Sequence, residues 1–270
     1  MATEKAEISE AAEPVLLRSD LDGIATLTLN RPKSGNSLSH ELVDTLQAAW
    51  DEIDNDASVR VVVLAASGRL FCTGHDLNES IDAMEDPPTK LAANRACSHM
   101  MQSMLKLSKP IIAKVHGVAT AAGCQLMATC DLAVASTEAR FATPGVNIGL
   151  WCLSPQVAIS RIIAPKHAMQ MLLTGELQDA ETALRFGLIN EAVAPDRLDA
   201  RVGELAARIA SKSPHSLAMG KRSFYRQLTM PLDEAYEYVD EVIVRAIQSE
   251  DAKEGISAFL EKRNPEWKGR

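Results

Sequence analysis

Two stretches of this chain have residue types suited to binding a carbonyl oxygen through backbone amides. The first spans Lys114 to Asp131, where the apolar run Pro110–Val115 turns through Gly117 and small residues into a helix expected over Ala122–Cys130. The first N–H groups of such a helix have no intrahelical partner, and their partial positive charge suits an oxygen that gains negative charge. Small side chains let a substrate approach that backbone closely.

The second stretch has the same order of elements. Arg60–Ala66 is an apolar strand-like run, and the segment Ser67–Leu77 that follows contains Phe-Cys-Thr-Gly-His-Asp-Leu at its end. Together, the two strand-to-turn units resemble the enoyl-CoA hydratase/isomerase (crotonase) superfamily, and the resemblance extends from about Val15 to Trp267. It implies an oxyanion hole that binds a thioester oxygen through the backbone N–H groups of His75 and Ala122.

The chain departs from that family at two positions. The resemblance places the usual catalytic glutamates on Gln125 and Gly145, and neither is a carboxylate. Paired carboxylates activate water and deliver a proton during hydration of a 2-enoyl thioester, and each positioned group is worth about 10²–10⁴-fold in rate. Gln125 can orient a water molecule but cannot accept a proton at neutral pH, and Gly145 offers only space. We therefore predict that thioester binding is retained and that classical hydratase turnover is weak or absent.

Several groups could replace the missing carboxylates. The imidazole of His75 titrates in a suitable range, and Cys124 lies near a helix N-terminus that would lower its pKa if it were exposed. Cys152 follows Trp151 in the stretch that corresponds to the acyl pocket, and an ordered water or small anion beside Gly145 is a further candidate. Alternative functions are another enolate reaction, such as decarboxylation or thioester hydrolysis, or non-catalytic acyl-CoA binding.

The resemblance also implies residues that bind the substrate or its coenzyme A moiety. Coenzyme A is expected only as part of the substrate, with no separate cofactor. Near the C-terminus, a Phe and a Lys match a family segment that meets the coenzyme A of a neighbouring subunit. The implied residues are Lys33, Asp76, Leu77, Asn78, Phe259 and Lys262.

The pattern along the chain indicates the elements that hold these residues. Alternation over Val15–Asn30 predicts a hairpin, and an apolar stripe predicts a helix over Ser39–Asp54. The segment 78–93 contains Pro87-Pro88 and is expected to be a mobile or irregular helix–loop region, followed by a helix over 95–107. The fold class is α/β, a crotonase-like ββα superhelix with a C-terminal helical subdomain.

Three parts of the chain are expected to differ in role. Residues 1–14 are expected to form a disordered tail, 15–195 the core with the thioester site, and 196–270 a helical subdomain for oligomerisation. A wide apolar stripe that includes Tyr236, Ile243 and Ile247 suggests an oligomer surface, and the resemblance implies a homotrimer or a dimer of trimers.

Charge and composition argue against several classes of function. A formal net charge of −8 argues against nucleic-acid binding, and no apolar run is long enough for a membrane span. The five cysteines form no CxxC pair or Cys/His metal spacing, so no metal site is expected. Because residues 1–14 have neither a hydrophobic signal core nor an Arg-rich transit pattern, the protein is expected to be cytoplasmic.

Overall fold

A six-stranded sheet forms the centre of the molecule in this computed structural model, which describes residues 13–82 and 85–270. The strand order is β1-β2-β3-β4-β6-β9, with β1 and β2 antiparallel and every later neighbour parallel. The predicted hairpin is confirmed, and it turns at Asp22 and Gly23, both with positive φ. The strands are β1 (Leu16–Leu21), β2 (Ile24–Leu29), β3 (Val61–Ala66), β4 (Ile111–Val115), β6 (Leu132–Ser136) and β9 (Glu191–Val193).

A second, smaller sheet lies where the chain leaves the first. Its order is β5-β7-β8, and β5 and β7 pair in parallel. These strands are β5 (Val118–Thr120), β7 (Arg140–Ala142) and β8 (Gln178–Asp179). Each of β4 and β6 continues after a short turn into a strand of the small sheet, so successive turns of the chain repeat the same path. This is the expected superhelical arrangement.

Helices cover both faces of the central sheet because β3 is apolar on both sides. Val62 and Leu64 belong to the large core cluster with α1 (His40–Asn55), α3 (Pro87–Lys106) and α4 (Ala122–Thr129), whereas Val61 and Val63 pack against α8 (Leu198–Ala210). Such continuous apolar strands are typical of parallel sheets buried on both faces. The chain was expected to divide at residue 196, but α8 packs on the sheet, so the C-terminal helices leave the body only after α8.

The helix α4 lies inside the body. All eight of its residues are buried, and it packs between α3 and α5 (Leu153–Ile162). A helix whose residues are buried on every side needs other elements packed around it. Further helices and 3-10 turns complete the body: η1 (Pro32–Ser34), α2 (Leu77–Asp82), η2 (Pro144–Ile148), α6 (Pro165–Thr174), α7 (Ala180–Phe186) and η3 (Pro195–Arg197).

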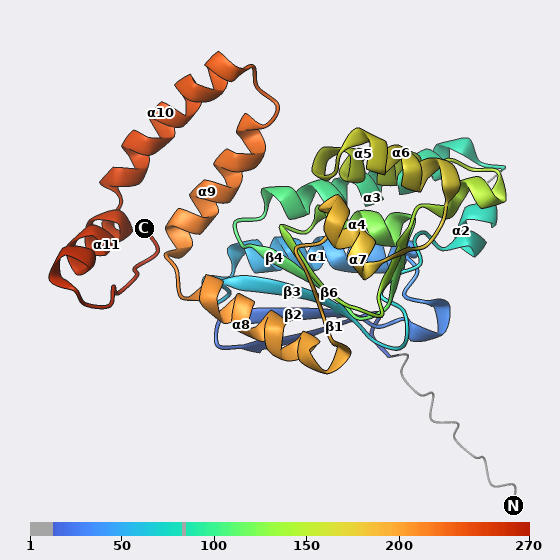
Figure 1. The fold of residues 1–270 in the computed structure, drawn as a ribbon, viewed down its shortest axis with the longest axis horizontal. Helices are drawn as coiled ribbons and strands as arrows, with labels where there is room; N and C mark the ends of the chain where they lie inside the picture. The colour runs from blue at the N-terminus through green and yellow to red at the C-terminus, as the bar shows by residue number, and fades with distance from the viewer. Residues whose placement is uncertain (1–12, 83–84) are drawn as a thin grey trace, which may run out of the picture.

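The last three helices form an arm that stands beside the body (Figure 1). They are α9 (Pro214–Gln227), α10 (Leu232–Gln248) and α11 (Glu250–Glu261), and α10 packs against α9 and α11. The arm is fastened by a largely buried ion pair between Lys221 Nζ and Asp131 Oδ2 at 2.6 Å. The same ammonium donates to the carbonyl oxygens of Met104 and Lys109, and Tyr225 donates its hydroxyl proton to Asp131.

Candidate functional site

The two segments expected to supply the amides lie side by side. Cys72 forms a parallel bridge with Ala119, and the amide of Thr120 donates to the carbonyl oxygen of Cys72 at 2.9 Å. The hydroxyl of Thr120 also donates to the carbonyl oxygen of Thr73 at 3.1 Å. The segment 71–75 is therefore held against β5 and the first turn of α4.

This contact brings the neighbourhood of His75 to the amide of Ala122. A Cβ on Gly74 would lie 3.1 Å from the Ala122 nitrogen and 2.9 Å from the Ala121 Cβ, and Gly74 has φ of 100°. Within residues 13–82 and 85–270, neither the backbone amide of His75 nor that of Ala122 donates a hydrogen bond. Ala122 is fully buried, where an unpaired amide is unusual, and His75 is half-buried, so both backbone amides are available to donate to a ligand oxygen.

Close packing explains why the turn is built from small residues. A Cβ on Gly123 would lie 2.1 Å from the carbonyl oxygen of Cys72, so only glycine fits. Ala121 has φ of 50° and ψ of −123°, a conformation that costs a residue with a Cβ about 1–3 kcal/mol. Ala122 has negative φ as the first residue of α4, so its methyl group causes no such strain.

The two positions expected to lack carboxylates have different surroundings. Gln125 is only 6% exposed, and its buried Oε1 has no hydrogen-bond partner in the described part of the chain. At Gly145 the expected free space is filled, since a Cβ there would lie 3.1 Å from both Cys152 Sγ and the Leu150 carbonyl oxygen. A water or small anion therefore has no ready place beside the Gly145 Cα.

Sequence reasoning did not single out Thr143, which lies beside this turn. The residue is fully buried, its hydroxyl has no partner among the described residues, and it precedes η2 without capping it. The amide of Ala121 donates to the carbonyl oxygen of Ala142 at 3.0 Å, which places Thr143 beside the turn that leads into α4. Its position just before the stretch that contains Gly145 was the only available signal.

The groups considered as replacements for a carboxylate are poorly placed to act. His75 Nε2 lies 3.4 Å from Cys97 Sγ, beside a cavity of about 20 Å³, and burial together with Lys90 and His40 lowers the pKa of the imidazole. Burial raises the pKa of Cys124 to about 12, opposite to the effect expected of an exposed thiol at a helix N-terminus.

Cys152 is likewise buried, and its burial raises the pKa of the thiol. Its neighbour Trp151 is half-buried and donates through Nε1 to Gln156 Oε1 at 2.7 Å. The sulfur of Cys152 is in contact range of Gly145, so this part of the expected acyl pocket borders the position of the second missing carboxylate.

The Asp76 carboxylate is hydrogen-bonded to other residues of the protein. Its Oδ2 accepts from Arg31 Nη2 at 3.1 Å and from Ser37 Oγ at 3.0 Å. Burial alone would raise the pKa of Asp76, but these hydrogen bonds hold it below its usual value. Asp76 therefore positions the loop that contains His75, whereas the following Leu77 and Asn78 are exposed at the start of α2.

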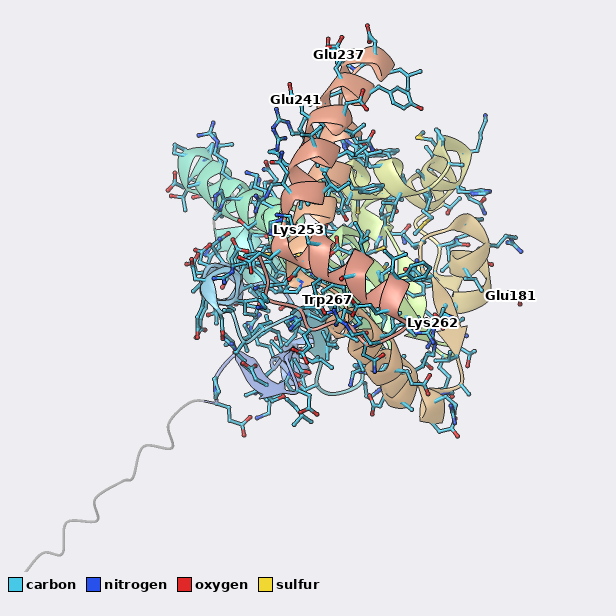
Figure 2. All side chains as sticks on the ribbon, turned by 90° about the vertical axis from the view of Figure 1, so that its left-hand side faces the viewer. Glu181, Glu237, Glu241, Lys253, Lys262 and Trp267 are labelled. Carbon is cyan, nitrogen blue, oxygen red and sulfur yellow. The ribbon has the colours of Figure 1, made fainter. Side chains whose placement is uncertain are left out.

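The residues expected to bind coenzyme A lie on separate parts of the chain. Lys33 is exposed in η1. Phe259 is 82% exposed on α11, and Lys262 ends that helix with φ of 56°. Figure 1 places α11 on the far side of the body from α2, and Figure 2 shows Lys262 on the outer surface of the arm. One chain therefore does not bring Phe259 or Lys262 to His75.

The comparisons with known proteins agree with this architecture. The family model described as enoyl-CoA hydratase/isomerase matches residues 20–270. The chain belongs to this family. The match confirms the resemblance and the α/β crotonase fold, and with them the expectation of an acyl-CoA-binding protein of this fold.

Relatives cover nearly all of the chain. The human enoyl-CoA hydratase domain-containing protein 3, mitochondrial, is 40% identical over 92% of this chain and 81% of the relative. The (E)-benzylidenesuccinyl-CoA hydratase of Thauera aromatica is 36% identical over 91% of this chain and 96% of that protein. The crystal structure of an enoyl-CoA hydratase from Mycobacterium smegmatis, 46% identical, superposes with a TM-score of 0.91 over 94% of this chain and 99% of that one.

The expected cytoplasmic location is wrong. The relatives from Homo sapiens, Mus musculus and Xenopus laevis are named mitochondrial proteins, which contradicts the cytoplasmic location expected from residues 1–14. Of that stretch, residues 1–12 lie outside the described part of the chain. In the described part, no helix has the length and hydropathy needed to cross a membrane, and no cluster of acidic, histidine and cysteine side chains could hold a metal ion.

Proposed function

We propose that this protein binds an acyl-CoA thioester with its carbonyl oxygen between the amides of His75 and Ala122, and that it hydrates 2-enoyl-CoA weakly or not at all. The observation that supports this most directly is the pair of adjacent, unpaired amides beside two positions that lack a carboxylate. Amides stabilise an enolate oxygen whatever their side chains, whereas hydration also needs a group that takes up a proton. The names of the relatives support a mitochondrial location.

A non-catalytic acyl-CoA binder is the second candidate. It is favoured by the raised pKa of Cys124 and the lowered pKa of His75, because an uncharged thiol and an imidazole that contacts Cys97 make poor proton acceptors for a substrate. Another enolate reaction, such as decarboxylation or thioester hydrolysis, is also a candidate. Such a reaction would use the same binding geometry, because it too needs a stabilised thioester oxygen.

Titration calorimetry with butyryl-CoA tests binding, and the absorbance of crotonyl-CoA tests turnover. We expect measurable binding and little turnover in the wild type. Gln125→Glu should raise hydration, by about tenfold or more, because it restores one proton acceptor. Gln102→Glu makes the same change at an exposed position of α3 and serves as the control.

A carboxylate at position 145 needs a second change. Because a Cβ there approaches Cys152 Sγ at 3.1 Å, Gly145→Glu should be combined with Cys152→Ala. Wild-type turnover of hundreds per second would contradict the argument from the missing carboxylates. Absence of binding to any acyl-CoA would contradict the proposed function as a whole.

The arm supports the proposal of a homotrimer or a dimer of trimers. Tyr236, Ile243 and Ile247 on α10 are 59–64% exposed, although they are large and apolar. Exposed apolar faces of this kind favour contact with another protein surface. Because α11 lies far from His75 within one chain, Phe259 and Lys262 could meet coenzyme A only at the site of another subunit. Light scattering gives the mass, and Lys262→Ala should weaken butyryl-CoA binding without changing that mass.

A further inference from the structure

A short linker, residues 211–213, joins α8 on the body to α9 on the arm. A segment of this kind between two packed units is the expected hinge. Here its first two residues are held by side chains from distant parts of the chain. The carbonyl oxygen of Ser211 accepts from Trp267 Nε1 at 2.8 Å, and that of Lys212 accepts from Arg60 Nη2 at 2.7 Å.

The third linker residue, Ser213, meets the C-terminal residues at the carboxylate of Asp251, which is 1% exposed. Ser213 donates its hydroxyl proton to Asp251 Oδ2 at 2.6 Å, and the same hydroxyl caps α9 by accepting from the Ser216 amide. The backbone amides of Lys268 and Gly269 donate to Asp251 Oδ1 at 2.7 and 3.1 Å. Asp251 itself lies in the first turn of α11. The N-termini of two helices therefore meet one negative charge, which their dipoles favour.

The charge of Asp251 depends on these donors. Burial alone would raise the pKa of Asp251, but the hydrogen bonds from Ser213, Lys268 and Gly269 hold it below its usual value. A buried carboxylate that loses such donors keeps the cost of its desolvation without compensation. The carboxylate therefore favours the state in which the linker and the C-terminal residues are bound to it together.

The C-terminal residues lie on the surface of the arm and outside its helices. Residues 264–270, all within the described part of the chain, form neither helix nor strand, and in Figure 1 the C-terminus lies between α11 and the start of α9. The half-buried indole of Trp267 packs on α11, since a Cβ on Gly255 would lie 3.1 Å from the ring, and it also lines a cavity of about 350 Å³ (Figure 2). The carbonyl oxygen of Arg270 accepts from the Asp251 amide at 3.0 Å. A few polar contacts and one incompletely packed ring thus hold the segment, so it can be released without disrupting the core.

We propose that residues 267–270 form a strap that locks the hinge between the body and the arm, held at one end by the Trp267 indole and at the other by the Asp251 carboxylate. Release of the strap removes the partner of the Ser211 carbonyl oxygen and weakens the attachment of Asp251, so the linker opens. The ion pair of Lys221 does not replace the strap, because it lies farther along α9 and does not contact the linker. The strap therefore determines whether the arm holds one direction relative to the body.

Limited digestion with endoproteinase Lys-C tests the strap, because this enzyme cleaves after lysine and Lys212 lies in the linker. Cleavage of a transiently opened segment follows the population of its open form. Trp267→Phe removes the indole N–H and keeps an aromatic ring, and it should raise the rate of cleavage after Lys212 about fivefold. Asp251→Asn removes a charged acceptor and should raise that rate at least tenfold. The matched control is Lys268→Ala, which should leave the rate unchanged, because position 268 contributes its backbone amide to the strap.

Mass spectrometry of the fragments distinguishes local opening from unfolding. If the wild type is cleaved after Lys212 as fast as both variants, the strap does not lock the hinge. A rise that occurs equally after Lys106, on α3 in the body, would show global unfolding and would also overturn the proposal. An equal rise in Lys268→Ala would show that the strap contacts are not responsible. These outcomes do not depend on acyl-CoA binding, which calorimetry tests separately.

Discussion

Replacing Ala121 by glycine should stabilise this protein, although alanine-to-glycine changes usually do the opposite. Ala121 has φ of 50° and ψ of −123°, and such a conformation costs a non-glycine residue about 1–3 kcal/mol. The greater conformational freedom of glycine in the unfolded chain offsets about 0.4–1 kcal/mol of the strain energy that the substitution removes. Ala121 is only half-buried, so its methyl group contributes little to packing. The net gain should be about 1 kcal/mol.

Urea unfolding followed by circular dichroism measures the effect on Ala121→Gly. A gain of about 1 kcal/mol corresponds to a rise in melting temperature of about 2–4 °C for a chain of this size. Ala92→Gly, on an exposed turn of α3, is the control and should lose about 1 kcal/mol. If Ala121→Gly loses as much stability as Ala92→Gly, the backbone of Ala121 is not strained and the reasoning is wrong.

Three further changes have expected outcomes. Gly123→Ala should lower the free energy of unfolding by more than the ~1–3 kcal/mol of ordinary overpacking, because the added carbon meets the Cys72 carbonyl oxygen; urea melts measure this. Lys221→Met should cost about 3–5 kcal/mol by leaving the Asp131 carboxylate without its cationic partner, and adding Asp131→Asn should recover part of that loss in the same melts. Burial lowers the pKa of His75 in the folded state, so its contribution to stability is complete above its ordinary 6.5 and declines as the pH falls below that value. His75→Asn should flatten the dependence of the urea midpoint on pH below about 6.5, and an unchanged slope would show that another group titrates there.

The strand–turn–helix around Ala122 was predictable because its sequence pattern is local. An apolar β-branched run, a glycine turn and small residues specify that geometry with little help from distant parts of the chain. The family resemblance implied that the segment ending in His75 lies beside the turn into α4, and the bridge between Cys72 and Ala119 joins these segments. Without the resemblance, nothing in either segment identifies the other as a neighbour.

The start of α3 was placed too late because prolines were treated as helix breakers. Pro87 and Pro88 occupy the first two positions of α3, where a missing N–H costs nothing, and the Asp86 side chain caps the helix by accepting from the Thr89 amide. The helix therefore begins eight residues earlier than the expected Arg95.

The surroundings of Gly145 and Thr143 could not be obtained from sequence. Whether a glycine borders open space depends on which side chain packs against it, and Cys152 is set there by the turn that follows η2. An unpaired hydroxyl is likewise a property of the packed structure, because the spacing of residues does not show which donors lie nearby.

The Asp131 carboxylate connects the arm to two other parts of the body. The same carboxylate accepts from the amide of Ile111 at the start of β4 and from Lys221 in α9, and it lies two residues after the end of α4. One side chain thus joins the start of the central strand β4, the segment that follows the inner helix, and the first helix of the arm. Because this contact ties α9 to the body, a change in the angle of the arm would have to break an ion pair that is largely shielded from water.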